Sequence, residues 1–323
     1  NYPKDKIEVI VVISKTTIDD TEKIAGRYPV KIVINPKILA EPGKTLGYKY
    51  CTGDLYLYLD SDAELVSENW LKNLTKPFIN DETIVGATTR YMPDPKQNAF
   101  NRFMSRSPLQ LPPMLEFLLP SFSNITIEKR KGYDLIKVDP KRCPPIGMCI
   151  FRKKILDKVI SDPDNFNYVD IAIPIQLAEL GYDKMAYVEK DAGFYHRRNS
   201  LMRELRRTRR DVAVTYLPVV GERKFHYVDF NNPIDLFKII YWVVYVNLII
   251  PSLLVGIYKT IKYKDWAGMF ELPLNFLLTN YVIYLFLTEK NGRKLLKNVF
   301  TGKSVTSIKS HALEKMFFVD SKK

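Results

Sequence analysis

Two carboxylates that could hold a divalent cation stand one residue apart in the chain. Asp60 and Asp62 come directly after an apolar run at residues 55–59. Mg²⁺ and Mn²⁺ accept oxygen ligands, and a cation bound to this pair would neutralise a diphosphate leaving group as its bond to a sugar breaks. An Asp-x-Asp pair is also common in solvated turns, so the surrounding elements decide which interpretation holds.

Short apolar runs and helical patterns alternate on both sides of this pair. The runs that predict strands are residues 7–13, 30–34, 55–59, 84–89, 147–151 and 187–188. The patterns that predict helices are residues 17–28, 43–50, 69–76, 152–160 and 171–180. This alternation predicts an α/β fold whose parallel sheet has helices on both faces, with residues 7–13 buried on both faces. Ligands bind at the carboxyl ends of strands in such sheets, where we expect the two aspartates. Residues 92–145 are less regular and are interpreted as an insertion over the site.

Residues 43–50 and 53–62 together resemble the core signature of family 2 glycosyltransferases. They contain a helix with glycines, a Gly-Asp pair, an apolar strand and Asp-x-Asp. Similarity continues at residues 146–153 and 168–170 and at Tyr195-His196, so that it covers roughly residues 1–210. The resemblance implies the GT-A fold, a Rossmann-like mixed or parallel sheet with helices on both faces. It also implies transfer of a sugar from a nucleotide-sugar donor.

The same resemblance implies which residues bind the donor and its metal. Asp60 and Asp62 would bind Mg²⁺ or Mn²⁺, and His196 would complete the metal shell. A structural, hydrogen-bonded histidine is the alternative for His196. Asp60, Lys44 and Ser14 are the expected contacts with the nucleotide sugar. The family usually carries acidic residues near Ser14 that contact the nucleotide, and their absence leaves the base preference open.

Asp170 is the expected catalytic base. By the resemblance it would take a proton from the acceptor hydroxyl during direct displacement with inversion. The alternative is that Asp170 is the N-cap of a helix starting at Ile171. Val169 stands where the family has a glutamate. This change keeps open a second reading, a GT-A-like membrane scaffold without activity. A third reading is a nucleotidyltransferase, but the Gly-rich basic loop expected near its start is not visible.

The positive charge is concentrated in two segments. The formal net charge is +13, and residues 197–210 and 289–323 each carry +6 of it. Both segments flank apolar stretches, which favours anionic membrane lipids as partners and argues against nucleic acid. The three cysteines have no disulfide or zinc-site spacing, which is typical of a reducing compartment.

Two apolar stretches predict a membrane anchor. Residues 239–258 contain no charge over twenty positions, and residues 272–288 offer seventeen more. We therefore predict a GT-A domain at 1–225, two transmembrane helices within 236–288 and a basic tail at 289–323. The basic segments predict a multi-pass protein of the cell membrane with its catalytic domain in the cytoplasm, although the connecting loop at 259–265 also carries three lysines. Buried helices in a soluble protein, or a second segment lying in the membrane interface, are the alternatives. The anchor suggests a lipid-linked or membrane-surface acceptor.

The strand at residues 7–13 resembles the second strand of the family rather than the first. We therefore expect a further apolar strand, with its nucleotide-binding loop, to precede the sequence that starts at Asn1. The alternative is that residues 7–13 form the first strand and that Ser14, Lys15 and Thr16 form an unusual nucleotide loop.

Overall fold

The computed structural model describes residues 1–37, 40–164, 166, 168–197, 200–221 and 226–308. The chain divides into two compact units. Among the described residues, the first unit contains Asn1–Arg90 and Phe122–Phe194, and the second contains Tyr91–Ser121 and the chain from Tyr195 to Ile308. The predicted domain boundary at residue 225 thus differs from this division, because the chain from Tyr195 onward groups with residues 91–121.

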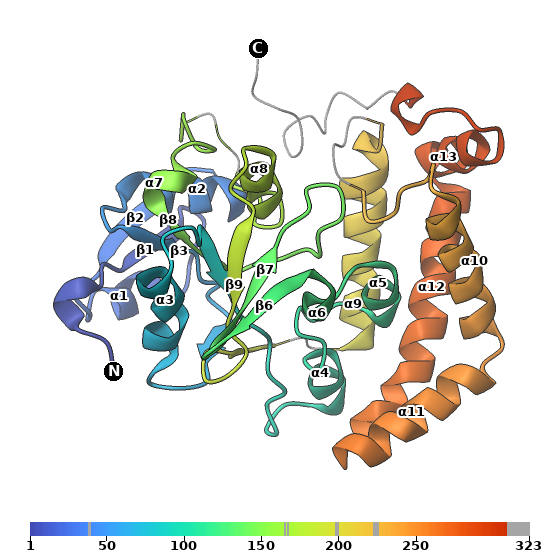
Figure 1. The fold of residues 1–323 in the computed structure, drawn as a ribbon, viewed down its shortest axis with the longest axis horizontal. Coiled ribbons are helices and arrows are strands. Elements are labelled where there is room, and N and C mark those ends of the chain that lie inside the picture. Colours follow the sequence, from blue (N-terminus) through green and yellow to red (C-terminus); the bar gives the residue numbers. More distant parts are fainter. Residues whose placement is uncertain (38–39, 165, 167, 198–199, 222–225, 309–323) are drawn as a thin grey trace. The chain divides into compact units, whose positions relative to one another are not determined.

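The first unit contains two sheets (Figure 1). In the smaller one, β1 (Ile10–Ser14) pairs with β2 (Lys31–Asn35) in parallel. The larger one has six strands in the order β3-β8-β5-β9-β7-β6. Its strands are β3 (Leu55–Leu57), β5 (Gly86–Thr88), β6 (Thr126–Arg130), β7 (Tyr133–Lys137), β8 (Ile150–Arg152) and β9 (Lys184–Tyr187). The helices of the unit are α1 (Thr21–Ala25), α2 (Ala40–Tyr50), α3 (Trp70–Asn80), α6 (Phe122–Ile125), α7 (Lys153–Leu156) and α8 (Ile173–Glu179). Two further short strands are β4 (Ala63–Leu65) and β10 (Phe194–His196), which crosses the boundary between the units.

The predicted α/β fold class with a mixed or parallel sheet is confirmed, and the larger sheet is mixed. β8 runs antiparallel to both of its neighbours, β3 and β5, and within this six-stranded sheet the parallel pair is β5 and β9. The hairpin of β6 and β7 lies in the stretch that the sequence pattern presents as irregular, and Gly132 adopts φ +96° in its turn. A left-handed conformation of this kind suits glycine because it has no Cβ. β1 and β2 pair only with each other among the described strands, so residues 7–13 are not buried on both faces: only Ile13 is buried, and Val9 is 44% exposed.

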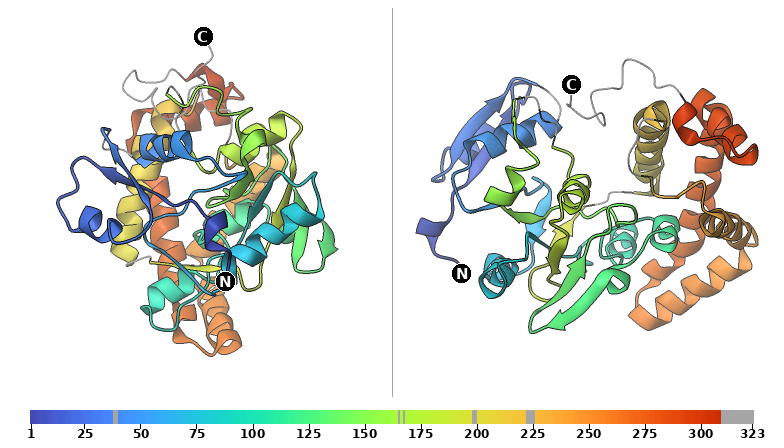
Figure 2. Two further views of the ribbon diagram at one scale, coloured as in Figure 1. Left: turned by 90° about the vertical axis from the view of Figure 1, so that its left-hand side faces the viewer. Right: turned by 45° about the horizontal axis from the view of Figure 1, so that its top comes forward.

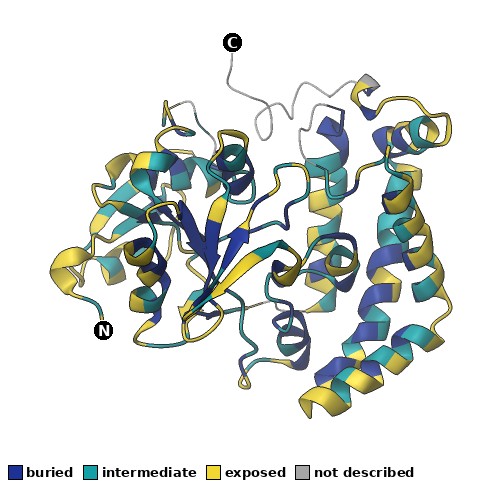
Figure 3. Ribbon diagram, in the orientation of Figure 1, coloured by how far each residue is buried: buried dark blue, intermediate teal, exposed yellow. Residues whose placement is uncertain are grey.

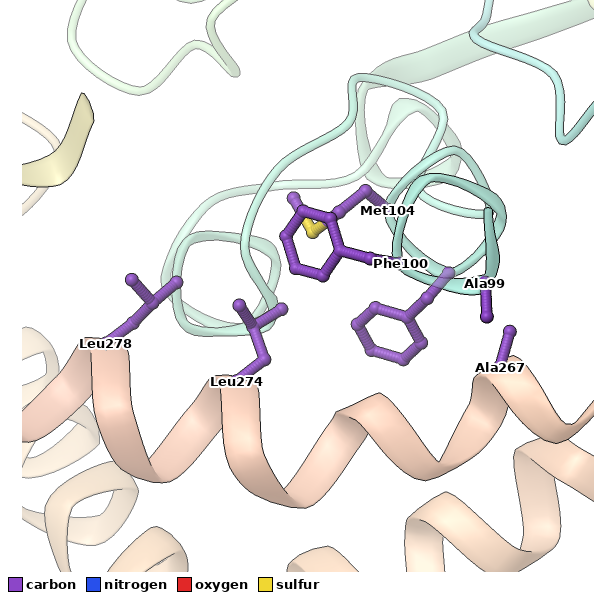
Figure 4. Packing of buried hydrophobic residues seen from close by; sticks show 7 residues of the cluster. Ala99, Phe100, Met104, Ala267, Leu274 and Leu278 are labelled. Atoms are coloured by element: carbon purple, nitrogen blue, oxygen red, sulfur yellow. The ribbon is translucent and has the colours of Figure 1, made fainter. Parts of the chain in front are cut away.

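The second unit is helical. It contains α4 (Ala99–Met104), α5 (Pro113–Leu118), α9 (Leu201–Arg209), α10 (Pro233–Asn247), α11 (Ile250–Tyr263), α12 (Glu271–Thr288) and α13 (Lys290–Phe300). A π-helix follows α9 at Arg210–Tyr216, and a 3₁₀ helix at Trp266–Phe270 leads into α12. Phe100 and Phe103 of α4 pack against Leu274 and Leu278 of α12 (Figure 4), and Leu205 of α9 joins this cluster. Within the basic segment, Leu201–Arg209 thus forms a helix whose two leucines, Leu201 and Leu205, face the core of its own unit.

The predicted first transmembrane segment is not one continuous helix. Residues 239–258 fall partly in α10 and partly in α11, and the two helices meet at an angle of 80°. The break lies at Leu248 and Ile249, where Ile249 has φ +63°. Pro251 lies in the first turn of α11, and a proline both lacks a backbone donor and restricts the residue before it. A single span here would therefore have to be a broken one, and it stays a prediction.

The second apolar stretch is continuous. Trp266–Thr288 forms a helical stretch of 23 residues, long and apolar enough to cross a bilayer. Among the described residues it is the one straight candidate, and the bent pair of α10 and α11 is a second if it counts as one broken span. Helices in the core of soluble proteins also have such lengths and compositions, so this observation alone gives weak support to a membrane span.

Candidate active site

The site of the first unit begins with the packing of α2 on β1 (Figures 1 and 2). Two glycines of α2 lie against this strand. A Cβ at Gly47 would lie 3.2 Å from Cγ2 of Val12, and a Cβ at Gly43 would lie 3.1 Å from Nδ2 of Asn35. Larger residues would therefore push the helix away from the strand. Lys44 follows Gly43 directly, so the close packing of this glycine fixes the position of the Lys44 backbone.

Lys44 forms an ion pair with Asp170. Its Nζ lies 2.7 Å from Oδ2 of Asp170, and the two side chains are only 11% and 21% exposed. The same Nζ lies 4.2 Å from the ring centre of Tyr58, in a cation–π contact. The other carboxylate oxygen, Oδ1 of Asp170, is buried and has no hydrogen-bond partner among the described residues. Asp170 thus presents one neutralised oxygen and one oxygen with unused acceptor capacity.

Asp170 is protonated more readily in its protein environment than it would be in water. Burial raises the pKa of the Asp170 carboxyl, and the charges of Asp60 and Glu41 act in the same direction. Lys44 opposes this shift through its charge and its hydrogen bond. A carboxylate with a raised pKa is a stronger base than an exposed one, which suits proton abstraction. The alternative N-cap role is wrong, because α8 starts at Ile173 and no side chain caps it.

Asp60 and Asp62 lie on one tight turn after β3. The backbone N–H of Ala63 donates to the carbonyl of Asp60 over 3.1 Å, which closes the turn. The hydroxyl of Tyr58 donates to Oδ1 of Asp60 over 2.5 Å. Burial and the Asp60 carboxylate both raise the pKa of Tyr58. The phenol therefore stays protonated and holds this carboxylate in place.

The backbone near Asp60 is also held by the segment that precedes β8. The N–H of Asp60 donates to Sδ of Met148 over 3.5 Å. Met148 is buried and has φ +46°, a conformation that non-glycine residues adopt infrequently. This residue explains why β8 starts at Ile150 and not at residue 147 as predicted, since a left-handed residue cannot continue a strand. Sequence reasoning did not identify the contact.

The two aspartates fit a divalent cation. Mg²⁺ and related ions are often held by one or two carboxylates together with waters and the phosphates of the substrate. Two carboxylates on one turn, one of them exposed, match that donor set. Among the described residues, no three histidine, cysteine or acidic side chains come together as a complete metal cage. A cation here would therefore depend on oxygen ligands from the nucleotide sugar.

Ser14 and His196 each have polar contacts within their own unit. Ser14 ends β1, and its Oγ lies 2.9 Å from Oγ1 of Thr16 in the turn that follows. His196 belongs to the second unit, where Nδ1 lies 2.8 Å from Oε1 of Gln110. Gln110 is fully buried, and its Nε2 donates to Oγ of Ser105 and to the carbonyl of His196. Gln110 is a further residue that sequence reasoning missed.

Aromatic rings surround the pair of Lys44 and Asp170. Tyr56 and Tyr58 lie two residues apart around β3, and both have a ring within 6.3 Å of the Tyr168 ring. The hydroxyl of Tyr56 donates to the carbonyl of Lys44 over 3.2 Å. The sequence indicates part of this cluster, because Tyr56 and Tyr58 are two residues apart and such residues in a strand share one face.

Three solved structures with similar chains have low identity and low TM-scores. A mycobacterial protein is 18% identical with a TM-score of 0.39, and the match covers 60% of this chain and 58% of that one. Glucosyl-3-phosphoglycerate synthase from Mycobacterium tuberculosis, in complex with Mn²⁺, uridine diphosphate and phosphoglyceric acid, is 18% identical with a TM-score of 0.39; the match covers 61% and 62%. The mannosyltransferase PcManGT from Pyrobaculum calidifontis, in complex with GDP-Man and Mn²⁺, is 16% identical with a TM-score of 0.44; the match covers 93% and 72%. This chain thus spans less than two thirds of the first two.

The comparison with protein families gives a more specific result. A search of curated proteins found no match. Residues 1–160, however, match the family model described as Glycosyl transferase family 2. This stretch contains Ser14, Lys44, Asp60 and Asp62, whereas Asp170 and His196 lie beyond it. The matched residues include the helix, strand and Asp-x-Asp turn of the site, and the chain belongs to glycosyl transferase family 2.

Proposed function

We propose that this chain transfers a sugar from a nucleoside-diphosphate donor to an acceptor hydroxyl, with inversion at the anomeric carbon. The observation that carries the proposal is the placement of Asp170. This buried carboxylate has one oxygen paired with Lys44 and the other without a described partner. Lys44 links it to the Asp-x-Asp turn, because Nζ of Lys44 also contacts the ring of Tyr58, whose hydroxyl donates to Asp60. A base beside a cation site is the arrangement that direct displacement requires.

In this mechanism Asp170 accepts the proton of the acceptor hydroxyl as its oxygen bonds to the anomeric carbon. The bond between that carbon and the diphosphate oxygen breaks, and the nucleoside diphosphate leaves with the bonding electrons. Lys44 stabilises the ionised form of Asp170 before the reaction. Its ammonium group also provides a positive charge for the departing diphosphate. Ser14 would contact the donor at the carboxyl end of β1.

The proposed cation site consists of Asp60 and Asp62, and its remaining oxygen ligands would come from the nucleotide sugar and water. Bound Mg²⁺ or Mn²⁺ supplies positive charge that stabilises the leaving diphosphate. Tyr58 fixes one oxygen of Asp60 through its hydroxyl, so the carboxylate is oriented before the cation arrives. Such outer hydrogen bonds commonly tune metal affinity.

We propose that the acceptor is lipid-linked or lies at a membrane surface. The support is the second unit, whose helices α10, α11 and α12 leave many large apolar side chains exposed (Figure 3). The basic segments at 197–210 and 289–323 favour the cytoplasmic leaflet, where anionic lipids attract lysine and arginine. A multi-pass arrangement would require α10 and α11 to form one span despite the bend of 80°.

A product assay tests the proposed chemistry. The full chain is incubated with Mn²⁺, a panel of nucleotide sugars and a polyprenyl-phosphate acceptor. We expect release of a nucleoside diphosphate, loss of release on chelation, and a product whose anomeric configuration is opposite to that of the donor. Release of pyrophosphate would instead identify a nucleotidyltransferase. If nucleotide sugars bind but no member of the panel is turned over, the inactive scaffold would be favoured.

A further inference from the structure

Helix α11 has its polar face inside and its apolar face outside. Its exposed stripe contains Ile250, Leu254, Ile257 and Ile261, which are 66%, 60%, 40% and 71% exposed. The spacing of four, three and four residues places them on one side of the helix. A helix at the surface of a soluble protein normally shows the opposite arrangement, with its apolar stripe against the core.

The polar face of α11 is fixed by close contacts within the second unit. A Cβ at Gly268 would lie 2.4 Å from the backbone nitrogen of Thr260, so the two backbones nearly touch. Nζ of Lys259 lies 2.6 Å from Oε2 of Glu271, whose side chain is only 4% exposed. Asn275 donates to the other oxygen of Glu271 over 3.0 Å. These contacts prevent α11 from turning its apolar stripe inward.

Helix α10 repeats this arrangement on the other side of the bend. Large apolar residues at helical spacing are exposed along it: Ile234, Phe237, Ile240, Tyr241 and Val244. The side facing the unit includes the buried residues Asp235 and Trp242. Nε1 of Trp242 donates to Oγ1 of Thr279 over 2.9 Å, which fixes the rotation of α10 about its axis. We name residues 233–263, which comprise α10, the bend and α11, the elbow.

The residues at the end of the elbow match a lipid–water interface. Lys262 and Lys264 are exposed there, beside Tyr258, Tyr263 and Trp266, which are 58%, 40% and 62% exposed. Tyrosine and tryptophan are enriched at the level of lipid headgroups, and lysine there pairs with anionic phosphates. An apolar stripe with aromatic and basic residues at its end is typical of a helix lying in the plane of a membrane surface.

Charged neighbours argue against a transmembrane hairpin. Asp265, in the turn between α11 and α12, is held at 2.8 Å by Arg102 of α4 and by Arg106, which follows α4. Helix α12 also packs against α9, which exposes Arg203, Arg206, Arg207 and Arg209. Arginines are costly in the hydrocarbon core, so α12 cannot be surrounded by lipid while it packs against α9.

We propose that the elbow binds one leaflet of an anionic bilayer and lies in its plane, without crossing it. The inserted surface is the exposed stripe of α10 and α11, and Lys262 and Lys264 contact the lipid phosphates. The polar faces of both helices stay attached to α12. This inference concerns membrane attachment alone and does not depend on the proposed chemistry.

Vesicle binding by the full chain tests the proposal. Preformed vesicles of phosphatidylcholine are compared with vesicles that also contain phosphatidylglycerol, and bound protein is measured by flotation. We expect binding to the anionic vesicles, and a loss of about tenfold or more in the partition constant for the double variant Ile250→Gln, Leu254→Gln. The matched control is Ile79→Gln on α3, which removes an isoleucine that is 83% exposed outside the elbow. Equal binding by the double variant and the control would overturn the proposal.

Trp266 reports the depth of insertion. The other two tryptophans, Trp70 and Trp242, are buried, so a change in emission on binding comes from Trp266 and disappears in Trp266→Phe. We expect a blue shift, and stronger quenching by lipids brominated near the headgroup than by lipids brominated near the chain ends. A second copy covering the elbow would instead give dimers in sedimentation and no flotation. Labelling of Lys264→Cys only from the far side of the membrane would establish the hairpin and overturn the proposal.

Discussion

Nζ of Lys44 lies 2.7 Å from Oδ2 of Asp170, and the two residues are 126 positions apart in the chain. The pair joins the residue expected to bind the donor to the residue expected to act as base. A diphosphate bound near Lys44 would compete with Asp170 for the ammonium group. Donor binding and the basicity of Asp170 are therefore coupled in the proposed mechanism.

Replacing Asp170 by asparagine should lower kcat by about 10²–10⁴-fold, because the variant cannot take the proton of the acceptor. Donor affinity should stay within a few-fold, since the base acts on the acceptor. Steady-state kinetics and calorimetric titration with the nucleotide sugar separate the two effects. Asp164→Asn is the matched control, because Asp164 also pairs with a lysine, Lys49, but is exposed. Loss of donor binding in a folded Asp170→Asn would place Asp170 in the donor site instead.

The charge of Lys44 should determine the pH below which the reaction rate falls. Burial, Asp60 and Glu41 raise the pKa of Asp170, and Lys44 lowers it. Lys44→Gln removes the lowering contribution, so the pKa of Asp170 rises further. Because the base acts only when ionised, activity in this variant should fall at a higher pH than in the natural chain. Lys44→Arg should restore the original pH dependence. If kcat falls at the same acidic pH in all three proteins, Lys44 does not control the ionisation of Asp170, and this prediction is contradicted.

Tyr58→Phe should weaken cation binding by about 10–100-fold, since the hydroxyl that orients Asp60 is lost while the ring beside Lys44 remains. Asp60→Asn and Asp62→Asn should each abolish metal-dependent transfer without unfolding the domain. Mn²⁺ titration in the presence of donor, followed by calorimetry, measures the affinity. Tyr50→Phe is the control, because Tyr50 is exposed and its ring contacts Lys31 outside the site. If both aspartate variants keep full activity in the presence of a chelator, the reaction does not depend on a metal at this site.

Gln110 should fix the tautomer of His196. Its Nε2 faces the carbonyl of His196, which can only accept, so Oε1 faces Nδ1 and the imidazole must carry its proton there. Neutral His196 therefore has a lone pair on Nε2, the form required of a metal ligand. Nitrogen chemical shifts of labelled protein should show a single Nδ1-protonated tautomer, and Gln110→Leu should give a mixture. An Nε2-protonated ring in the natural chain would exclude this arrangement.

The local pattern predicted most elements of the first unit but not the direction of every strand. Residues 30–34, 43–50 and 55–59 lie close to β2, α2 and β3 as observed. The antiparallel direction of β8 could not be predicted, because a buried apolar run is compatible with either direction. The hairpin of β6 and β7 was missed because polar residues such as Glu128 and Lys129 interrupt its apolar alternation.

Residue types alone located the candidate site, whereas its internal contacts required the structure. Asp60 and Asp62 were recognisable because they follow an apolar strand. The pairing of Lys44 with Asp170 was not, since the interaction links a helix to a loop far along the chain. The bend near Ile249 was indicated by Pro251, but its angle of 80° was not, because an uninterrupted apolar run predicts length and not the backbone angle. The expected strand before residue 7 stays a prediction.

The near contact of Gly268 with Thr260 affects how newly synthesised chains behave. Because the elbow cannot rotate its isoleucines inward, the folded protein exposes the same adhesive surface before it meets lipid as after. If chains are synthesised faster than new bilayer forms, their exposed apolar surfaces would therefore associate with one another. The associating chains would be correctly folded, and no unfolding would be needed. Solubility during expression would then depend on membrane area per cell rather than on thermal stability, and mild detergent would restore dispersion without refolding.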